Sequence, residues 1–485
     1  MAVKVHRAPE GEEPRGFRDL DFREIVGGFG THGITRCLQL HRESLVANAA
    51  TLRAVAELAV VMAYFYLCDR TTFFRETDKH YSRDFFAFFC LLLVAFAGYT
   101  SLGKVKRPTL LNRDQTEEWK GWMQVLFLLY HYFAAAEMYN SIRLYIAAYV
   151  WMTGYGNFTY YYRTRDYSAS RLVGMLWRLN FFVVVCCMLL RNSYTLYYIC
   201  PMHTLYTLAV IAVVAAFDGW NGSARGLLAK LGAAAAIVAV VWGDEAAFYR
   251  LWRPLQWLVG YENPARPGKA DPLHEWFFRS GLDRFVWIVG MLCAFLKPQA
   301  EAALAAVDGL APRPRAAAYG GLAAGILALF VAYKGSFYDM DKFAYNRHHP
   351  YTSWIPICLF IALRNLHPTL RAYTLGLFAW LGKITLETYI AQFHIWLSSS
   401  VPDGQPKHLL ALIPEYPLLN FALCTVIYIY TSHRIFRLTV ALKDAACPED
   451  LSLLLKNFWV MGVYGGVTYA AGAAVNLAFR PAAMG

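Results

Sequence analysis

His131 is the residue whose type and position most directly suggest chemistry in this chain. It follows Lys120 by eleven residues, and the segment between them turns from polar to apolar. A histidine inside a membrane helix is costly to bury and usually has a function, and a neutral imidazole is the usual general base for a hydroxyl or thiol. We therefore predict that His131 is catalytic and is reached from one face of a membrane. The alternative is that it only bonds to a neighbouring helix carbonyl.

A second candidate for chemistry is the run LGKITLETYIAQFHIWL. Glu387 and His394 lie seven residues apart in it and therefore share one face of a predicted helix. A carboxylate inside a membrane needs a partner, and Arg143, Arg178 or Lys334 from other spans could supply one. We predict that Glu387 and His394 are catalytic; the alternative is a packing role.

Basic and polar residues at or just inside the cytoplasmic ends of several predicted spans suggest a phosphate-bearing ligand, because the arginine fork matches phosphate. For Arg163 and Arg165 the alternative is that they only orient the chain in the membrane. Pro201 should kink its helix and place His203 at the kink, where a packing bond is an equally good interpretation. The candidate ligand-binding residues are Lys120, Arg163, Arg165, Arg178, Asn180 and His203.

The segment KGSFYDMDKFAYNRHHPYTSW combines carboxylates, amides and rings. Carboxylates and amides can hydrogen-bond the hydroxyls of a polyol, and aromatic rings offer an apolar body with a polar edge. An ordinary polar loop is the alternative. The candidate substrate-binding residues are Asp339, Asp341, Asn346, His349 and Trp354.

Composition excludes a soluble domain. Of the 485 residues, 57% are hydrophobic and only 16% are charged, against about 25% charged in soluble domains, and the apolar residues form long blocks. The net charge of +12 comes from Lys and Arg in short loops between these blocks, so a lipid membrane rather than nucleic acid is the expected partner. The ten cysteines show no metal-ligand spacing, and we predict no metal site.

The apolar blocks predict an all-α, polytopic membrane helix bundle with about thirteen transmembrane helices. With a cytoplasmic N-terminus, five of the six loops assigned to the cytoplasm are basic, as the positive-inside rule requires. The predicted spans are 48–68, 85–103, 119–138, 142–159, 172–190, 196–217, 226–242, 284–298, 317–334, 353–366, 372–397, 412–431 and 457–479. We expect three regions: a cytoplasmic tail (1–47), two N-terminal transmembrane helices (48–103) and a multi-spanning domain (104–480).

Several long runs carry a resemblance to a known family: RDQTEEWKGWMQ, YHYFAAAEMYN, YVWMTGYGNF, MLWRLNFF, YYICPMHTL and LGKITLETYIAQFHIWL. They resemble the Reduced Wall Acetylation proteins of plants, and are similar to the membrane domain of the animal sialic-acid O-acetyltransferase and its fungal capsule relatives. The resemblance covers roughly residues 50–480. It implies an acyltransferase-superfamily core, in which a basic residue precedes a catalytic histidine by about eleven positions. Lys120 and His131 stand at that interval, with Lys where the superfamily usually has Arg.

The resemblance implies O-acetylation of cell-wall polysaccharides in the Golgi membrane, with cytosolic acetyl-CoA as the donor and no metal. The animal relative carries an N-terminal luminal Ser-Asp-His domain, whereas about 47 residues precede the first span here. We therefore expect either direct transfer to the polysaccharide or transfer through a separate luminal O-acetyltransferase partner. Two alternatives remain open: a transporter that carries acetyl-CoA or another acetyl donor into the lumen, and a scaffold for luminal transferases.

Overall fold

The computed structural model describes residues 46 and 48–478, which are mostly helical. Each predicted span overlaps at least one described helix, so the prediction of an all-α polytopic bundle is confirmed. The predicted cytoplasmic tail, residues 1–47, lies outside the described residues apart from Val46.

Two sets of helices make up the fold. Helices that coincide with predicted spans are α4 (Ala49–Arg70), α5 (Arg83–Ser101), α6 (Arg113–Phe133), α7 (Tyr139–Thr164), α8 (Ala169–Leu190), α9 (Ile199–Ala215), α10 (Ala224–Gly243), α14 (Val286–Asp308), α15 (Pro312–Tyr333), α17 (Trp354–Asn365), α19 (Gly376–Lys383), α20 (Thr385–Ile395), α21 (Pro417–Ala446) and α22 (Leu451–Ala478). Shorter helices that connect them are η2 (Ala136–Met138), η3 (Tyr194–Tyr197), η4 (Asp218–Gly222), α11 (Glu245–Trp252), η5 (Arg253–Leu255), α12 (Gln256–Val259), α13 (His274–Leu282), η6 (Lys334–Tyr338), α16 (Lys342–Thr352) and α18 (Pro368–Ala372).

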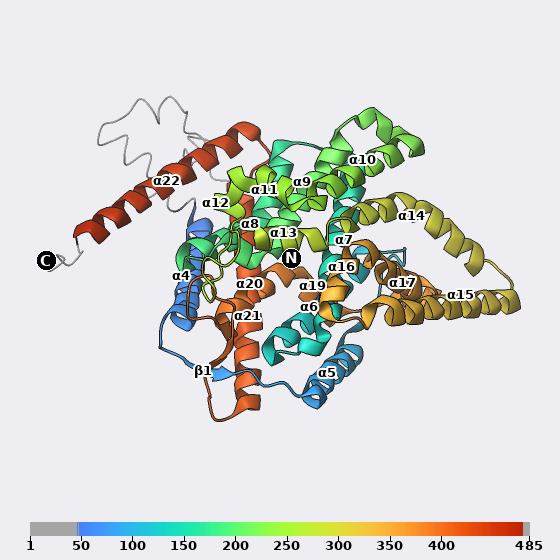
Figure 1. The fold of residues 1–485 in the computed structure, drawn as a ribbon, viewed down its shortest axis with the longest axis horizontal. Helices are drawn as coiled ribbons and strands as arrows, with labels where there is room; N and C mark the ends of the chain where they lie inside the picture. Colours follow the sequence, from blue (N-terminus) through green and yellow to red (C-terminus); the bar gives the residue numbers. More distant parts are fainter. Residues whose placement is uncertain (1–45, 47, 479–485) are drawn as a thin grey trace, which may run out of the picture. The chain divides into compact units, whose positions relative to one another are not determined.

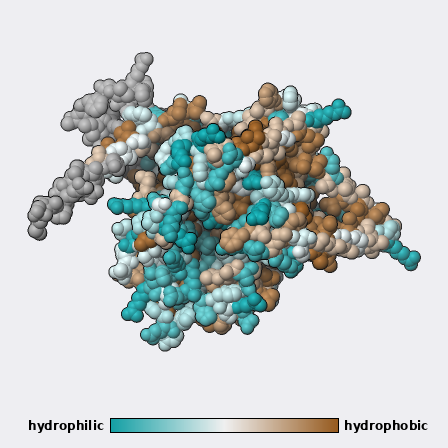
Figure 2. Space-filling view, viewed as in Figure 1, coloured by the Kyte–Doolittle hydropathy of each residue, from teal (hydrophilic) through white to brown (hydrophobic). Residues whose placement is uncertain are grey.

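Apolar length identifies the helices that face lipid most clearly. Within the described residues, six helical stretches are long and apolar enough to cross a membrane, and α15 is among them with only 6% of its apolar window buried. Figure 1 shows α14 and α15 meeting at the turn that connects them and diverging from it, and Figure 2 shows hydrophobic side chains along them. Helices α6 and α7 do not meet the same criterion, because they carry polar and charged side chains that point into the protein.

The described residues divide into two compact units. The smaller unit holds the start of α4, residues 168–178 and the chain from Arg437 onward. The larger unit holds residues 61–167 and 179–436, and therefore contains α6, α7 and α9 with the helices packed on them.

Glycines let the backbones of α6 and α19 touch. A Cβ atom on Gly121 would lie 1.9 Å from the carbonyl oxygen of Phe378, and one on Gly382 would lie 1.9 Å from that of Glu117. Neither distance is possible for a real side chain, so the close approach requires glycine at both positions. Small residues at helix interfaces have this role in membrane proteins, and here they hold α6 firmly against the bundle.

Glycines also allow the backbones of α7 and α14 to touch. A Cβ atom on Gly154 would lie 2.0 Å from the carbonyl oxygen of Trp287, and one on Gly290 would lie 2.2 Å from that of Trp151. The two helices that position the site, α6 and α7, are thus each held by a backbone-to-backbone contact.

Short antiparallel strands tie distant connections together. Strand β1 (Arg75–Asp78) pairs with β5 (His408–Ala411), which also pairs with β4 (Leu397–Ser398). Strand β2 (Leu102–Lys104) pairs with β3 (Tyr373–Leu375). The first sheet anchors the connections after α4 and α20 to each other, and the second anchors the end of α5 to the start of α19.

The predicted span 372–397 is not one helix. It comprises β3, α19 and α20, with the helix interrupted at Ile384. Gly382 packs against the backbone of Glu117 just before the interruption, so this contact coincides with the break. The sequence did not reveal the break, although the polar Lys383 and Thr385 flank it directly.

Candidate active site

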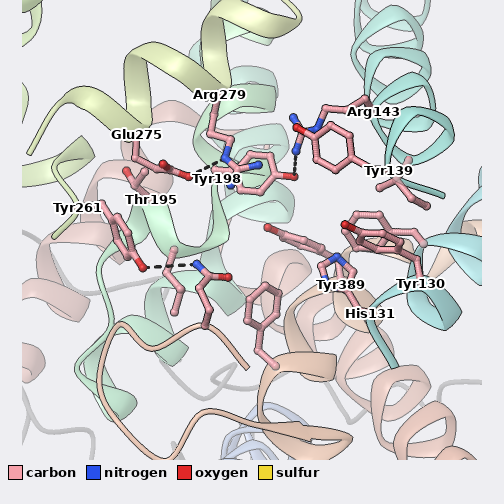
Figure 3. Close-up of a pocket in the computed structure, with 15 residues that line it drawn as sticks. Tyr130, His131, Tyr139, Arg143, Thr195, Tyr198, Tyr261, Glu275, Arg279 and Tyr389 are labelled. Carbon is pink, nitrogen blue, oxygen red and sulfur yellow. Dashed lines mark hydrogen bonds and ion pairs between the residues drawn. The ribbon is translucent and has the colours of Figure 1, made fainter. Parts of the chain in front are cut away.

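A polar cavity of about 220 Å³ lies within the larger unit. Figure 3 shows aromatic and charged side chains from several helices converging on it. The residues that line it are Phe127, Tyr130, His131, Tyr139, Ile142, Arg143, Thr195, Leu196, Tyr198, Tyr261, Glu275, Arg279, Tyr389, Phe393 and Gln405.

His131 faces this cavity from the last turn of α6. The helix begins at an Asn112 cap, whose side chain accepts a hydrogen bond from the backbone of Gln115 (2.9 Å), and it ends at Ala134 in the left-handed conformation. The imidazole packs against Phe127, with ring centroids 4.6 Å apart. Among the described residues, none forms a hydrogen bond with its ring nitrogens, so the imidazole can accept a proton from a ligand in the cavity.

Opposite His131, two arginines and a glutamate surround Tyr198. The guanidinium of Arg279 lies 4.5 Å above the Tyr198 ring and donates to Glu275 over 2.7 Å. Arg143 donates from Nη2 to the Tyr198 hydroxyl over 3.1 Å. The cluster therefore holds both guanidiniums on one tyrosine ring at the cavity wall (Figure 3).

Part of the cavity lining comes from connections between helices. The Tyr261 hydroxyl donates to the carbonyl oxygen of Asp403 (2.9 Å), and Thr195 donates to that of Val259 (2.7 Å). These residues and Gln405 fall in the connections that the sequence assigns to the face opposite the cytoplasm. In that predicted topology this part of the cavity lining lies on the luminal side.

Lys120 lies in the first half of α6, about two turns from its N-terminal end. It precedes His131 by eleven positions, which is roughly 16 Å along the axis. Its ammonium group forms an ion pair with Glu117 (2.7 Å), and its carbonyl oxygen accepts a hydrogen bond from Tyr149 (2.8 Å). The structure therefore places Lys120 outside the cavity, and the two residues cannot contact the same atom of a small ligand.

Glu387 and His394 do not line the cavity, although α20 does reach it. The cavity-lining residues of α20 are Tyr389 and Phe393. His394 is 1% exposed and its two ring nitrogens contact Asp69 (Nδ1, 2.6 Å) and the Tyr197 hydroxyl (Nε2, 2.5 Å). Glu387 is fully buried. The structure thus separates these two predicted catalytic residues from His131.

The predicted donor-binding residues do not gather in one place. Arg163 is exposed, and Arg165 forms an ion pair with Asp218 (3.3 Å). In the smaller unit, Arg178 donates to the Thr439 hydroxyl.

The remaining two, His203 and Asn180, form bonds inside the larger unit. His203 contacts the Thr153 hydroxyl through Nδ1 (2.6 Å), and Asn180 donates to Thr204 (3.0 Å). The predicted kink at Pro201 is wrong, because α9 begins at Ile199 and a proline in the first helical turn interrupts no hydrogen bond. His203 therefore belongs to a regular helix that faces α7.

The segment that we predicted to bind a polyol is helical rather than a loop. It forms a π-helix, η6, followed by α16. Asp341 caps α16 by accepting from the backbone of Phe343 (2.9 Å), and Asp339 forms an ion pair with Lys334 (2.6 Å). Both carboxylates thus have partners within their own segment.

Of the other predicted substrate-binding residues, Asn346 lies nearest the cavity. It donates to the hydroxyl of Tyr139, a lining residue, over 2.9 Å. His349 is fully buried and contacts Asp283 through Nε2 (3.3 Å), and Trp354 donates to the carbonyl oxygen of Tyr351 (2.9 Å). The segment therefore supports the cavity wall through Asn346.

Similarity to known proteins agrees with this helical architecture. Residues 34–459 match the family model of the 10 TM acyl transferase domain found in Cas1p. The chain belongs to this membrane acyltransferase family. Every residue that lines the cavity lies within the matched region. The family description counts ten membrane helices, fewer than the thirteen spans expected from the sequence.

A curated relative of this chain is the N-acetylneuraminate (7)9-O-acetyltransferase of Danio rerio. It is 33% identical over 434 residues, which are 85% of this chain and 53% of the relative. The chain thus spans about half the length of that relative. No solved structure shows a significant match.

Sequence reasoning missed most of the residues that the structure places around His131. Arg143 was considered only as a partner for Glu387, although an arginine inside a span is itself a sign of a site. Glu275 and Arg279 lie in a predicted connection, where their spacing of four residues was the available signal. The tyrosines that line the cavity could not be singled out from the sequence, because tyrosine is common throughout the chain.

Proposed function

We propose that this protein is a membrane O-acetyltransferase, with His131 as the general base. The observation that carries the proposal is an imidazole without a hydrogen bond from any described residue, facing a polar cavity in a protein of the acyltransferase family. The name of the zebrafish relative supports an acetyl group as the acyl group and a sugar hydroxyl as the acceptor.

The chemistry needs one proton acceptor and a good leaving group. A hydroxyl of the acceptor, bound in the cavity, gives its proton to His131 while its oxygen attacks the carbonyl carbon of the acetyl thioester. The carbon–sulfur bond then breaks, and the thiolate takes the proton back from the imidazolium. Alternatively, His131 itself attacks the thioester and holds the acetyl group before the hydroxyl accepts it. Both routes release a free thiol and one acetyl ester.

The donor approaches from the Lys120 end of α6 in this proposal. A donor with a long flexible arm, such as acetyl-CoA, could keep its charged part near Lys120 and present its thioester to His131. Polar groups of α6 and α7 lie along the helix between Lys120 and His131. Gln124 accepts from the Tyr149 hydroxyl (3.3 Å) and donates to Thr388 (3.1 Å). We keep as candidates for binding the donor, within the larger unit, Arg163, Arg165, Asn180 and His203. Arg178, in the smaller unit, stays a separate candidate.

The other predicted catalytic residues receive positioning roles. Glu387 and His394 are buried in α20, which supplies Tyr389 and Phe393 to the cavity. We propose that they fix α20 rather than touch the acetyl group. Likewise Asp339, Asp341, Asn346, His349 and Trp354 would shape the acceptor side of the cavity.

The biological setting follows from the sequence resemblance. The long runs shared with the Reduced Wall Acetylation proteins support acetylation of cell-wall polysaccharides in the Golgi, with a cytoplasmic N-terminus and acetyl-CoA as the donor. The acceptor would be the polysaccharide itself or a luminal O-acetyltransferase that passes the acetyl group on.

The test uses purified wild type and His131→Ala in liposomes, with acetyl-CoA labelled on the acetyl group. Wild type should release coenzyme A and pass label to a sugar acceptor. The variant should lose both by about 10²–10⁴-fold, the usual contribution of a general base.

His433→Ala is the matched control for this test. His433 also lies in a long helix, α21, and its ring packs on Trp380 (5.4 Å) away from the cavity. This variant should keep wild-type transfer. Intact labelled acetyl-CoA inside the liposomes, from wild type and His131→Ala alike, would contradict the proposal and identify a transporter.

A further inference from the structure

Arg143 has more hydrogen-bond donors than the protein uses. Its side chain is 3% exposed and lines the cavity. Nη2 donates to the Tyr198 hydroxyl, but among the described residues no acceptor reaches Nε or Nη1. A buried guanidinium with unsatisfied donors is costly, above all in a membrane helix. Such a group points to a ligand that completes it.

Arg279 lines the same cavity but, unlike Arg143, has a carboxylate as a hydrogen-bond partner. Its Nε donates to the carboxylate of Glu275 over 2.7 Å, and its guanidinium packs 4.5 Å from the Tyr198 ring. Glu275 therefore neutralises Arg279. Two arginines against one glutamate leave a single positive charge in the lining, and that charge is on Arg143.

The other lining groups are suited to a sugar. Five tyrosines face the cavity, and their rings and hydroxyls can stack on and bond to a polyol. We propose that the acceptor is an acidic sugar, whose carboxylate binds the free donors of Arg143 while a hydroxyl lies at His131. This inference rests on the proposed function in placing in the cavity the acceptor and, of the donor, only the thioester.

Charge and position favour a carboxylate over the phosphates of the donor. A carboxylate carries one negative charge, which matches the one unbalanced guanidinium, whereas a phosphate monoester carries more than one at neutral pH. Part of the cavity lining also comes from connections that the predicted topology places on the side away from Lys120. The donor's phosphates would have to cross the protein to reach Arg143.

The test is equilibrium binding to the full chain in nanodiscs, without an acetyl donor. The probes are galacturonic and glucuronic acid, each compared with its methyl ester, which differs only in the charge at C6. Wild type should bind at least one acid about tenfold or more tightly than its ester, as expected for a charge-assisted contact. In Arg143→Gln this preference should fall below about twofold.

Arg284→Gln is the matched control. Arg284 also donates to a tyrosine hydroxyl, that of Tyr351 (2.6 Å), and lies over two rings, but it does not line the cavity. This variant should keep the preference for the acid. His131→Ala should keep it too, so failure of the proposed chemistry remains distinguishable from failure of this inference.

Arg143→Lys replaces Arg143→Gln in the test if the latter does not fold, because lysine keeps the buried charge but lacks the planar donor set of arginine. The preference of Arg143→Lys for the acid over its ester should be smaller than that of wild type. Equal or undetectable binding of acid and ester by wild type would overturn the proposal, as would an undiminished preference in the Arg143 variants. Loss of coenzyme A binding in these variants, with acid binding intact, would assign Arg143 to the donor and also overturn it.

Discussion

The imidazole of His394 lies 2.6 Å from the carboxylate of Asp69, across 325 residues of sequence. Asp69 is 1% exposed and also accepts from the backbone nitrogens of Ser399 (2.8 Å) and Ser400 (3.2 Å). On its other side His394 contacts Tyr197. One buried pair thus joins the end of α4, α20 and the connection after it, and α20 in turn supplies two residues of the cavity.

We predict that His394→Ala destabilises the protein by about 1–3 kcal/mol, because it removes one partner of the buried Asp69 carboxylate, which keeps its ion pair with Arg70. The midpoint of thermal unfolding should fall clearly, and transfer should fall with it. His131→Ala, in contrast, should melt as wild type does while losing transfer. Wild-type melting of His394→Ala with complete loss of transfer would contradict the positioning role and return His394 to the chemistry.

The sequence predicted the helical bundle well, because hydropathy alone reveals apolar blocks of membrane length. It could not predict how the blocks are interrupted. The break at Ile384 coincides with a backbone contact between Gly382 and Glu117, which are far apart in the sequence. The helicity of α13 was also missed, since the long connection that contains it has no continuous apolar block.

Within the candidate site, the sequence singled out His131 but not its surroundings. An isolated histidine in an apolar helix is conspicuous, whereas Tyr139, Tyr198 and Arg279 become a cluster only when α7, α9 and α13 pack together. The same limit applies to His394, whose shared face with Glu387 indicated a joint site. Its contacts with Asp69 and Tyr197 come from other elements and were not visible in the local pattern.

Lys79 should make stability depend on pH. It lies in the connection between α4 and α5, where burial lowers the pKa of its ammonium group from the ordinary 10.5 to about 8, and it donates to the carbonyl oxygen of Pro406 (2.7 Å). Between these two values the unfolded chain binds the proton and the folded protein does not. Stability from this group therefore rises as pH increases from about 8 to 10.5, and the full cost of burying the charge is present below about 8.

The measurement for Lys79 is the difference in thermal midpoint between wild type and Lys79→Met across pH 7 to 10. Because the variant has no titrating group at this position, subtracting its thermal midpoint from that of wild type removes the contribution of all other groups. The midpoint of wild type should rise relative to that of the variant as pH increases above about 8. A difference in thermal midpoint that stays constant over this range would show that burial does not lower the pKa of Lys79, and would contradict the prediction.

Two glycines of α7 offer a matched pair. Gly154→Ala would place its Cβ 2.0 Å from the carbonyl oxygen of Trp287, whereas no heavy atom lies within 4 Å of the same position on Gly156. We predict that Gly154→Ala costs about 1–3 kcal/mol or more by forcing α7 and α14 apart. Gly156→Ala should be neutral or stabilise by up to about 1 kcal/mol, through the better helix propensity of alanine. Thermal unfolding in detergent measures both, and equal midpoints for the two variants would contradict the close contact of α7 and α14.

Lys120 should affect the donor and not the acceptor. It lies roughly 16 Å along α6 from His131, where it forms an ion pair with Glu117 (2.7 Å) and is partly exposed. We predict that Lys120→Gln raises the KM for acetyl-CoA about tenfold, since a phosphate contact is lost, and leaves the KM for the acceptor within about twofold. Lys120→Arg should keep most of the affinity, because guanidinium also binds phosphate.

The control for Lys120 is Arg113→Gln on the same helix. Arg113 also approaches Glu117 (3.9 Å), but its side chain is 87% exposed, so its loss should change neither KM. Steady-state kinetics with each substrate varied in turn separates the two effects. If Lys120→Gln raised the acceptor KM instead, the donor could not enter from the Lys120 end of α6, and the direction of transfer across the membrane would have to be reversed.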